Sequence, residues 1–236
     1  MMDLISNDAA SAMASGTHAV HFVPLAITQS DSTHGCVAGL SVTGEWLRPE
    51  PIMAAELGKG SVYQYRRFCR AHLGPSEAED CRPEDKRVLA PTTVALGMET
   101  VTTDAAWLNW YRAHCDNDVE SCFVGDRSVG LIEVTPERVY AKRATGQRVF
   151  ARMVFRDATG EAFDWIVPEI AFSSYVLERL SPNASAAEEA AILKPLQQRK
   201  VLLCLGLTKP NNRFPGKFRG CHPLVVGVHA FLEYGG

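Results

Sequence analysis

A basic and aromatic stretch near the carboxyl end carries the side chains best suited to binding a charged ligand. Residues 208–222 read TKPNNRFPGKFRGCH, with four Lys or Arg, two Phe and no acidic residue. Cations can neutralise a phosphate backbone while aromatic rings stack on bases, each stack contributing ~1–3 kcal/mol. The stretch predicts a nucleic-acid-binding loop that uses Lys209, Arg213, Phe214, Lys217, Phe218 and Arg219. The structural alternative is a solvated loop whose two rings pack on the protein body.

Two further places carry cations that suit the same ligand. A second basic and aromatic patch consists of Tyr65, Arg66, Arg67, Phe68 and Arg70. Its alternative role is to pair with the acidic loop 77–85. Arg48 stands before a proline at the end of a predicted strand, where the chain leaves a rigid sheet and binding groups are often found. We expect Arg48 to orient the ligand, and a solvated surface arginine is the alternative.

Cysteine and histidine supply the candidate ligands for a soft metal. The seven cysteines include no C-x-x-C pair, which indicates free thiols in a reducing compartment. A zinc or iron–sulfur centre would draw on Cys69, His72, Cys81, His114, Cys115 and Cys122. Their spacing follows no known zinc finger, so we expect no bound metal.

Acidic residues supply the candidates for hydrolytic chemistry. A Mg²⁺-assisted phosphodiester reaction would use the carboxylates of Asp80, Glu84, Asp85 and Asp164. Nothing in the sequence brings these four together. The chain also contains no P-loop, G-x-S-x-G, H-E-x-x-H or G-x-G-x-x-G motif. We therefore expect a binding function rather than catalysis, and no cofactor.

The composition excludes several classes of protein. The 236 residues carry a formal net charge of −3, whereas a protein that coats duplex DNA non-specifically needs a broad basic field. No apolar run approaches the ~20 residues that span a bilayer. Residues 1–18 lack the basic start and apolar core of a secretory signal. We expect a cytoplasmic protein with no membrane partner and a disordered tail over residues 1–18.

Short strands with inserted helices must position these side chains. Alternating or continuous apolar patterns predict strands at 19–30, 36–41, 45–49, 61–73, 88–96, 129–134, 148–155, 162–167, 201–207 and 224–232. Gly44 and Gly160 mark the turns of two hairpins, and Pro24 predicts a bulge or bend in the first strand. Helical spacing and capping residues predict helices at 103–115, 168–180 and 184–198.

These motifs make the chain resemble the dual-OB domain family, prokaryotic proteins expected to hold two OB-type barrels in tandem. The resemblance rests on the hairpin CVAGLSVTGEWLRP at 36–49, Pro83-Glu84-Asp85, the strand 130–136, the hairpin 148–167 with the following Pro168-Glu169, and the strands 202–210 and 225–229. It covers roughly residues 19–234. It implies a module that recognises nucleic acid or nucleotides, often linked to mobile-element conflict or regulation, without a shared catalytic constellation.

Pattern and resemblance together predict a mainly β protein with inserted helices, folded as two tandem small OB-like barrels. The first barrel takes residues 19–136 and the second takes residues 137–236. The predicted function is binding of single-stranded DNA or RNA, or of a nucleotide-like ligand. One alternative is a metal-assisted enzyme acting on nucleic acid or nucleotides. The other is a protein-binding adaptor whose partner covers the exposed aromatic residues.

Overall fold

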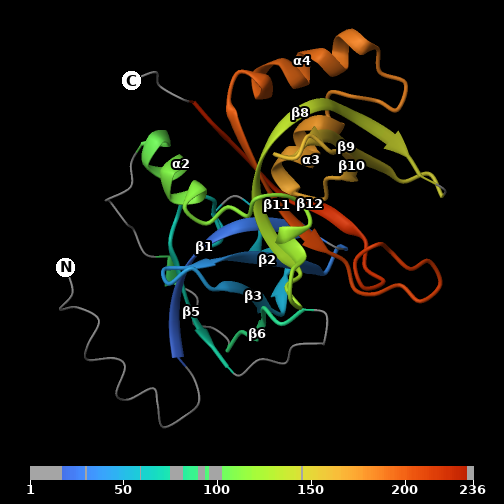
Figure 1. The fold of residues 1–236 in the computed structure, drawn as a ribbon. Coiled ribbons are helices and arrows are strands. Elements are labelled where there is room, and N and C mark those ends of the chain that lie inside the picture. Colours follow the sequence, from blue (N-terminus) through green and yellow to red (C-terminus); the bar gives the residue numbers. More distant parts are fainter. Residues whose placement is uncertain are drawn as a thin grey trace.

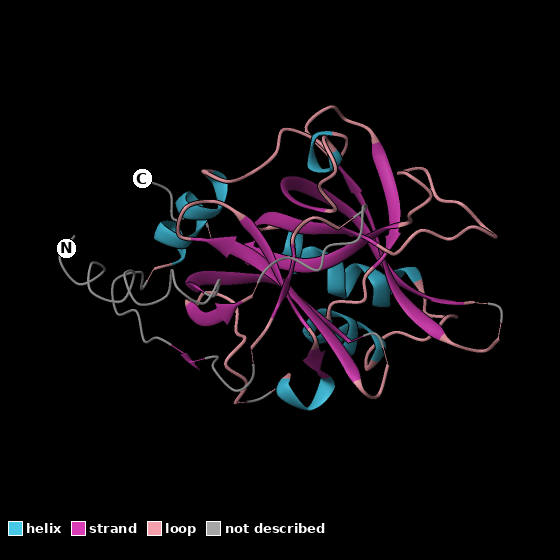
Figure 2. Cartoon of the chain, turned by 90° about the horizontal axis from the view of Figure 1, so that it is seen from below, coloured by secondary structure: helices cyan, strands magenta, loops and turns pink. Residues whose placement is uncertain are grey.

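The protein is mainly β, with two sheets and a few helices (Figure 1). The computed structural model describes residues 18–232 except 30, 59, 75–81, 90–93, 96–102 and 145. In Figure 2 the strands are the prevailing regular elements, and the helices lie between and around them. The mainly β fold with inserted helices is therefore confirmed. The assignment of the two sheets to OB-type barrels stays a prediction.

The first sheet has seven strands in the order β6–β3–β2–β1–β5–β7, with β4 beside β2. Its strands are β1 (His18–Gln29), β2 (His34–Ser41), β3 (Trp46–Glu50), β4 (Ile52–Met53), β5 (Cys69–Leu73), β6 (Asp85–Arg87) and β7 (Val94–Ala95). Both predicted features of this sheet are confirmed. The β1–β2 register shifts between Pro24 and Ala26, and Gly44 turns the β2–β3 hairpin with φ 82°.

The second sheet has five strands in the order β10–β9–β8–β11–β12. Its strands are β8 (Val129–Arg143), β9 (Val149–Arg156), β10 (Ala162–Ile166), β11 (Lys200–Leu207) and β12 (Pro223–Phe231). The predicted β9–β10 hairpin is confirmed, with Gly160 in its turn at φ 84°. The continuous apolar pattern of β11 predicted burial on both faces, and every residue from Val201 to Leu207 is buried.

The three predicted helices are present within narrower bounds than expected, and the predicted cap at Thr103 is confirmed. They are α2 (Asp104–Arg112), α3 (Ile170–Leu177) and α4 (Ala186–Gln197), and two short 3₁₀ turns accompany them, η1 (Ala54–Glu56) and η2 (Ser121–Phe123). The Thr103 hydroxyl accepts the Ala106 N–H at the start of α2, and Ser185 forms a capping box with Glu188 at the start of α4. In Figure 1, α4 lies beside β8.

Two strand predictions differ from the structure. The stretch 61–73 was expected to be a strand running into a loop, but it begins as turns and becomes a strand only at Cys69, since Arg66 has a positive φ of 59° that an extended strand does not allow. The stretch 88–96 contributes only β7, and 90–93 and 96 lie outside the described residues. The predicted tail lies there too, except for His18, where β1 begins. Within the described part of the chain, no helix has the length and apolar character needed to cross a membrane.

The two sheets pack against each other through a shared core, which we call the sheet junction. Side chains from β1, β2, β3, α2, β8, β11 and β12 form one buried cluster there. The strands β1 and β12 approach so closely that a Cβ on Gly227 would lie 1.9 Å from the carbonyl oxygen of Leu25. The domain boundary expected after residue 136 falls inside β8, which runs without a break from Val129 to Arg143.

Candidate nucleic-acid interface

The predicted basic and aromatic stretch forms the loop between β11 and β12, which we call the β11–β12 loop (208–222). Figure 1 shows it as a red loop that extends away from the two sheets. Its base is anchored by Phe218, which is only 9% exposed and packs on Phe123 with ring centroids 4.7 Å apart. Phe218 therefore takes the structural role that we considered as the alternative, and its ring is not open to a ligand.

Two of the four cations in the loop have partners in the segment 118–127. The Lys217 ammonium pairs with the Glu120 carboxylate. The Arg219 guanidinium donates to the carbonyl oxygens of Gly125, Asp126 and Arg127 at 2.8–3.0 Å, and lies 3.5 Å from the Asp126 carboxylate. These contacts join parts of the chain that are about ninety residues apart, so the local absence of acidic residues did not reveal them.

The tip of the loop presents Phe214 to solvent in a fixed arrangement. Phe214 is 63% exposed. The side-chain oxygen of Asn211 accepts the backbone N–H groups of Arg213 (3.0 Å) and Phe214 (2.9 Å), and His222 Nε2 donates to the Phe214 carbonyl (2.7 Å). The Arg213 guanidinium lies 5.5 Å from the centre of the Phe214 ring. Lys209 is also exposed. The tip thus combines an exposed ring on an ordered backbone with the Arg213 cation beside it.

The second predicted patch contributes mainly to the protein interior. The Tyr65 hydroxyl donates to Glu169 (2.9 Å), and Phe68 is buried beside two tryptophans of α2. Arg66 pairs with Asp104 (2.6 Å), outside the acidic loop 77–85, and its guanidinium lies 4.4 Å from the Phe231 ring centre. In this patch Arg67 is exposed and Arg70 is half-buried. The five residues therefore do not form one open surface.

Arg48 is a buried structural residue, which corrects the expectation of a strand-end side chain facing a ligand. It is 3% exposed. Its guanidinium donates to Asp85 Oδ1 (3.0 Å) and to Ser128 Oγ (2.8 Å), and Ser128 in turn donates from its N–H and Oγ–H to the Glu84 carboxylate at 2.6 and 2.9 Å. This chain of bonds connects β3 and β6 of the first sheet to the start of β8.

The candidate metal ligands are dispersed. Among the described residues, no group of three His, Cys, Asp or Glu side chains is arranged to hold an ion. Burial raises the pKa of Cys69 to about 11 and that of Cys115 to about 12, and it also raises the pKa of Cys122, so all three favour the neutral thiol. His72 lies on β5 and His114 just after α2, while Asp80 and Cys81 lie outside the described residues.

The three described carboxylates are engaged elsewhere. Glu84 and Asp85 belong to the Arg48 network. Asp164, on β10, accepts from Arg152 Nε (2.9 Å) and from the Tyr140 hydroxyl (2.6 Å). Asp85 and Asp164 therefore pair with the protein's own arginines, and Glu84 accepts from Ser128.

A cationic and aromatic face on the β8–β9 hairpin was not predicted as a site. Register and alternation place Tyr140 and Lys142 of β8 on one face with Phe150 and Arg152 of β9. The Arg138 guanidinium lies 4.4 Å from the Tyr140 ring centre, and that of Arg148 lies 4.9 Å from the Phe150 ring centre. The alternation of charged and apolar residues at 148–155 was the available signal. This alternation predicted a strand at 148–155. The row of rings and cations forms only in the folded protein, where β8 lies beside β9.

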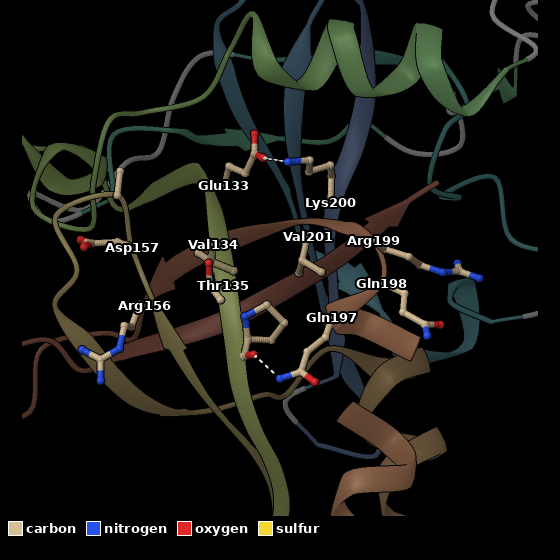
Figure 3. Close-up of a pocket in the computed structure, with 12 residues that line it drawn as sticks. Glu133, Val134, Thr135, Arg156, Asp157, Gln197, Gln198, Arg199, Lys200 and Val201 are labelled. Atoms are coloured by element: carbon tan, nitrogen blue, oxygen red, sulfur yellow. Dashed lines mark hydrogen bonds and ion pairs between the residues drawn. The ribbon is translucent and has the colours of Figure 1, made fainter. Parts of the chain in front are cut away.

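The structure also contains a polar hollow that the sequence did not indicate (Figure 3). It has a volume of about 800 Å³ and lies where β8, the end of β9 and the connection from α4 to β11 meet. Its lining residues come from three segments, Glu133–Pro136, Arg156–Ala158 and Gln197–Val201. Because these segments are distant in sequence, no local motif marks the site.

Comparison with known proteins adds no family to this description. No family model matches the chain, and no curated protein matches it. The function is therefore argued from the arrangement of the side chains themselves.

Proposed function

We propose that the protein binds single-stranded nucleic acid at the tip of the β11–β12 loop. The observation that carries the proposal is the exposed Phe214 ring, whose backbone is held by Asn211 and His222 and which has the Arg213 guanidinium beside it. A ring on an ordered backbone loses less conformational entropy on stacking than one on a mobile chain, and the adjacent cation attracts the phosphate of the stacked nucleotide.

The charges at the tip predict a modest salt dependence. All four cations of the loop are exposed, and Lys217 and Arg219 are in addition held by acidic groups and carbonyls. For a single strand, log K falls with log salt by about 0.7 per phosphate contact. When two cations contact phosphates, raising the salt from ~50 to ~200 mM weakens binding about sevenfold. When all four do so, the same rise in salt weakens binding about fiftyfold. Stacking accepts every base, so weak base preference is expected.

The β8–β9 hairpin offers a second surface for the same ligand. Lys142 and Arg148 are exposed there, and within the described residues neither has an acidic partner. Arg138 and Arg152, in contrast, pair with Glu189 and Asp164. The free cations thus lie toward the hairpin tip, beside Phe150. A strand that follows this face gains phosphate neutralisation there and stacking at the half-buried ring.

Fluorescence anisotropy with labelled single-stranded DNA and RNA at ~50 and ~200 mM salt tests the proposal. The wild type is compared with an Arg213→Ala/Phe214→Ala variant, which we expect to bind at least tenfold more weakly. A matched control exists at the end of α3, where the guanidinium of Arg179, just after the helix, lies 4.0 Å from the centre of the exposed Tyr175 ring. An Arg179→Ala/Tyr175→Ala variant should bind like the wild type. Equal binding by the loop variant and the wild type, or no binding by the wild type, contradicts the proposal.

A protein-binding adaptor is the second candidate, favoured by an exposed apolar residue beside the loop's anchor. Val124 is 71% exposed and precedes Gly125, whose carbonyl oxygen holds Arg219. Exposed apolar and aromatic side chains mark protein interfaces when they gather in one patch. Affinity capture with wild type and with Val124→Ser/Phe214→Ala distinguishes this candidate. A partner retained only by the wild type, together with absent oligonucleotide binding, favours the adaptor.

A further inference from the structure

The polar hollow lies at a break that the topology of the second sheet creates. β8 pairs with β11 up to Val134, opposite Val201, and pairs with β9 from Thr135, opposite Arg156. Along β8, the pairing with β11 on one edge therefore stops where the pairing with β9 on the other edge starts. The β8–β9 register also shifts between Pro136 and Arg138 at this place. Such bulges are over-represented beside functional sites, because they redirect side chains.

The hollow is lined mainly by polar and cationic side chains. Arg156 and Arg199 lie at opposite sides of it, with Thr135 and Gln197 between them (Figure 3). Arg156 is held by Glu137 (2.6 Å) and the Gly160 carbonyl (2.7 Å). Within the described chain, in contrast, the Arg199 guanidinium makes no hydrogen bond or ion pair. It is an exposed cation at the rim of a ligand-sized space.

Both carboxylates that line the hollow already bind groups of the protein itself. Glu133 accepts from Arg112 Nε and NH2 at 2.8 and 2.9 Å, and the Lys200 ammonium lies 3.9 Å from the same carboxylate. Arg199, in contrast, has neither carboxylate as a partner. The Asp157 carboxylate accepts the Val119 and Thr159 N–H groups. Its oxygens are thus occupied by local hydrogen bonds rather than by the cations of the hollow.

We propose that this hollow binds a small organic anion, with Arg199 holding its phosphate or carboxylate group. A guanidinium presents a fork of N–H donors that matches either group, and charge-assisted hydrogen bonds are stronger than neutral ones. The Thr135 hydroxyl and the Gln198 amide, both exposed, supply hydrogen bonds for the rest of the ligand. The volume of about 800 Å³ is within the range of pockets that take small molecules. The proposal does not depend on nucleic-acid binding at the β11–β12 loop.

Isothermal titration calorimetry with three probes tests the proposal. Adenosine monophosphate, inorganic phosphate and succinate are titrated separately into the full chain, with 50 mM chloride as background. We expect at least one of them to bind, and its affinity to fall tenfold or more in Arg199→Ala. Arg199→Lys keeps the charge without the fork and should retain an intermediate affinity. The side chain of Arg199 has no described partner, so both variants should unfold at the wild-type temperature.

The three probes and a crossed control separate the outcomes. Binding of adenosine monophosphate alone supports a nucleotide ligand, binding of phosphate alone supports a phosphate group as the feature recognised, and binding of succinate alone supports a carboxylate. Arg213→Ala, in the β11–β12 loop, should leave each affinity unchanged. Absence of binding by all three probes at millimolar concentration overturns the proposal. So does an affinity that is equal in wild type and Arg199→Ala.

Discussion

The sheet junction and the β11–β12 loop place the same kinds of side chain in opposite environments. In the junction, Arg48 is 3% exposed and bonds to Asp85 and Ser128, and His229 Nε2 donates to the Leu25 carbonyl (2.8 Å). In the loop, Arg213 is exposed beside Phe214. Sequence position alone suggested that both arginines bind a ligand. The comparison teaches that a cation's role depends on whether distant segments supply acceptors for it.

The junction also explains why the two sheets are held together. Its polar contacts connect segments that lie far apart in the chain. Tyr65 donates to Glu169, and the N-terminal end of α3 donates to the same carboxylate from Ala171 and Phe172. Such buried groups need partners, because an unpaired buried polar atom costs about 1–3 kcal/mol. The loop has no such requirement, since water solvates its cations.

The largest effect is expected from removing the junction arginine. Arg48→Ala removes the buried guanidinium that pairs with Asp85 and donates to Ser128, and breaking one side of a buried ion pair costs about 3–5 kcal/mol. Urea denaturation should show this loss in the free energy of unfolding. Arg213→Ala is the matched control in the loop and should change it by less than about 0.5 kcal/mol. Similar losses in both variants would remove the distinction between the two regions.

A pH titration provides the second test of the junction. Burial lowers the pKa of His229 from 6.5 to about 4 in the folded protein. The unfolded state therefore binds the proton more tightly. The contribution of the neutral His229 to the free energy of unfolding is fully present above about pH 6.5. It is lost as the pH drops toward 4, by as much as about 3 kcal/mol.

Denaturation at pH 7.5 and pH 4.5 measures this loss, and a His229 variant isolates it. His229→Gln is expected to reduce the difference in stability between the two pH values, although it also destabilises the protein at pH 7.5. His222→Gln, in the exposed loop, should leave the difference as in the wild type. An unchanged difference in His229→Gln would falsify the assignment.

The third effect concerns binding rather than stability. Phe214→Ala removes the stacking ring and is expected to weaken single-stranded DNA binding by about 1–3 kcal/mol, or roughly fivefold to 150-fold. Its thermal unfolding should match the wild type, because the ring is 63% exposed. Phe218→Ala is expected to show the reverse pattern, losing stability because it empties the contact with Phe123. Anisotropy measures the DNA affinity of both variants, and thermal melts measure their stability.

The smallest effect is expected for the anchored cations of the loop. Lys217→Ala breaks an exposed pair with Glu120, which contributes less than about 1 kcal/mol and is screened by salt. We expect binding to single-stranded DNA to weaken by less than about threefold, with the salt slope unchanged. A slope that falls by about 0.7 would show that Lys217 leaves Glu120 and contacts a phosphate.

Local patterns predicted most of the fold but only part of the candidate interface. The bulge near Pro24, the turn at Gly44 and the cap at Thr103 follow from backbone preferences of single residues, so they were visible in sequence. The partners of Lys217 and Arg219 lie in the segment 118–127, and nothing in the loop itself signals them. Burial of Phe218 follows from the same contact between the two segments.

The sequence by itself determined the mainly β class, the hairpins, the helix starts and the position of one loop rich in cations and rings. These features depend on side-chain periodicity and on conformations available to individual residues. Only the tertiary structure decided which charged groups are buried in the sheet junction, which cations remain exposed, and where β8 changes partners to leave a hollow. The physical reason is that desolvation and ion pairing depend on distances between segments far apart in the chain, which no local pattern records.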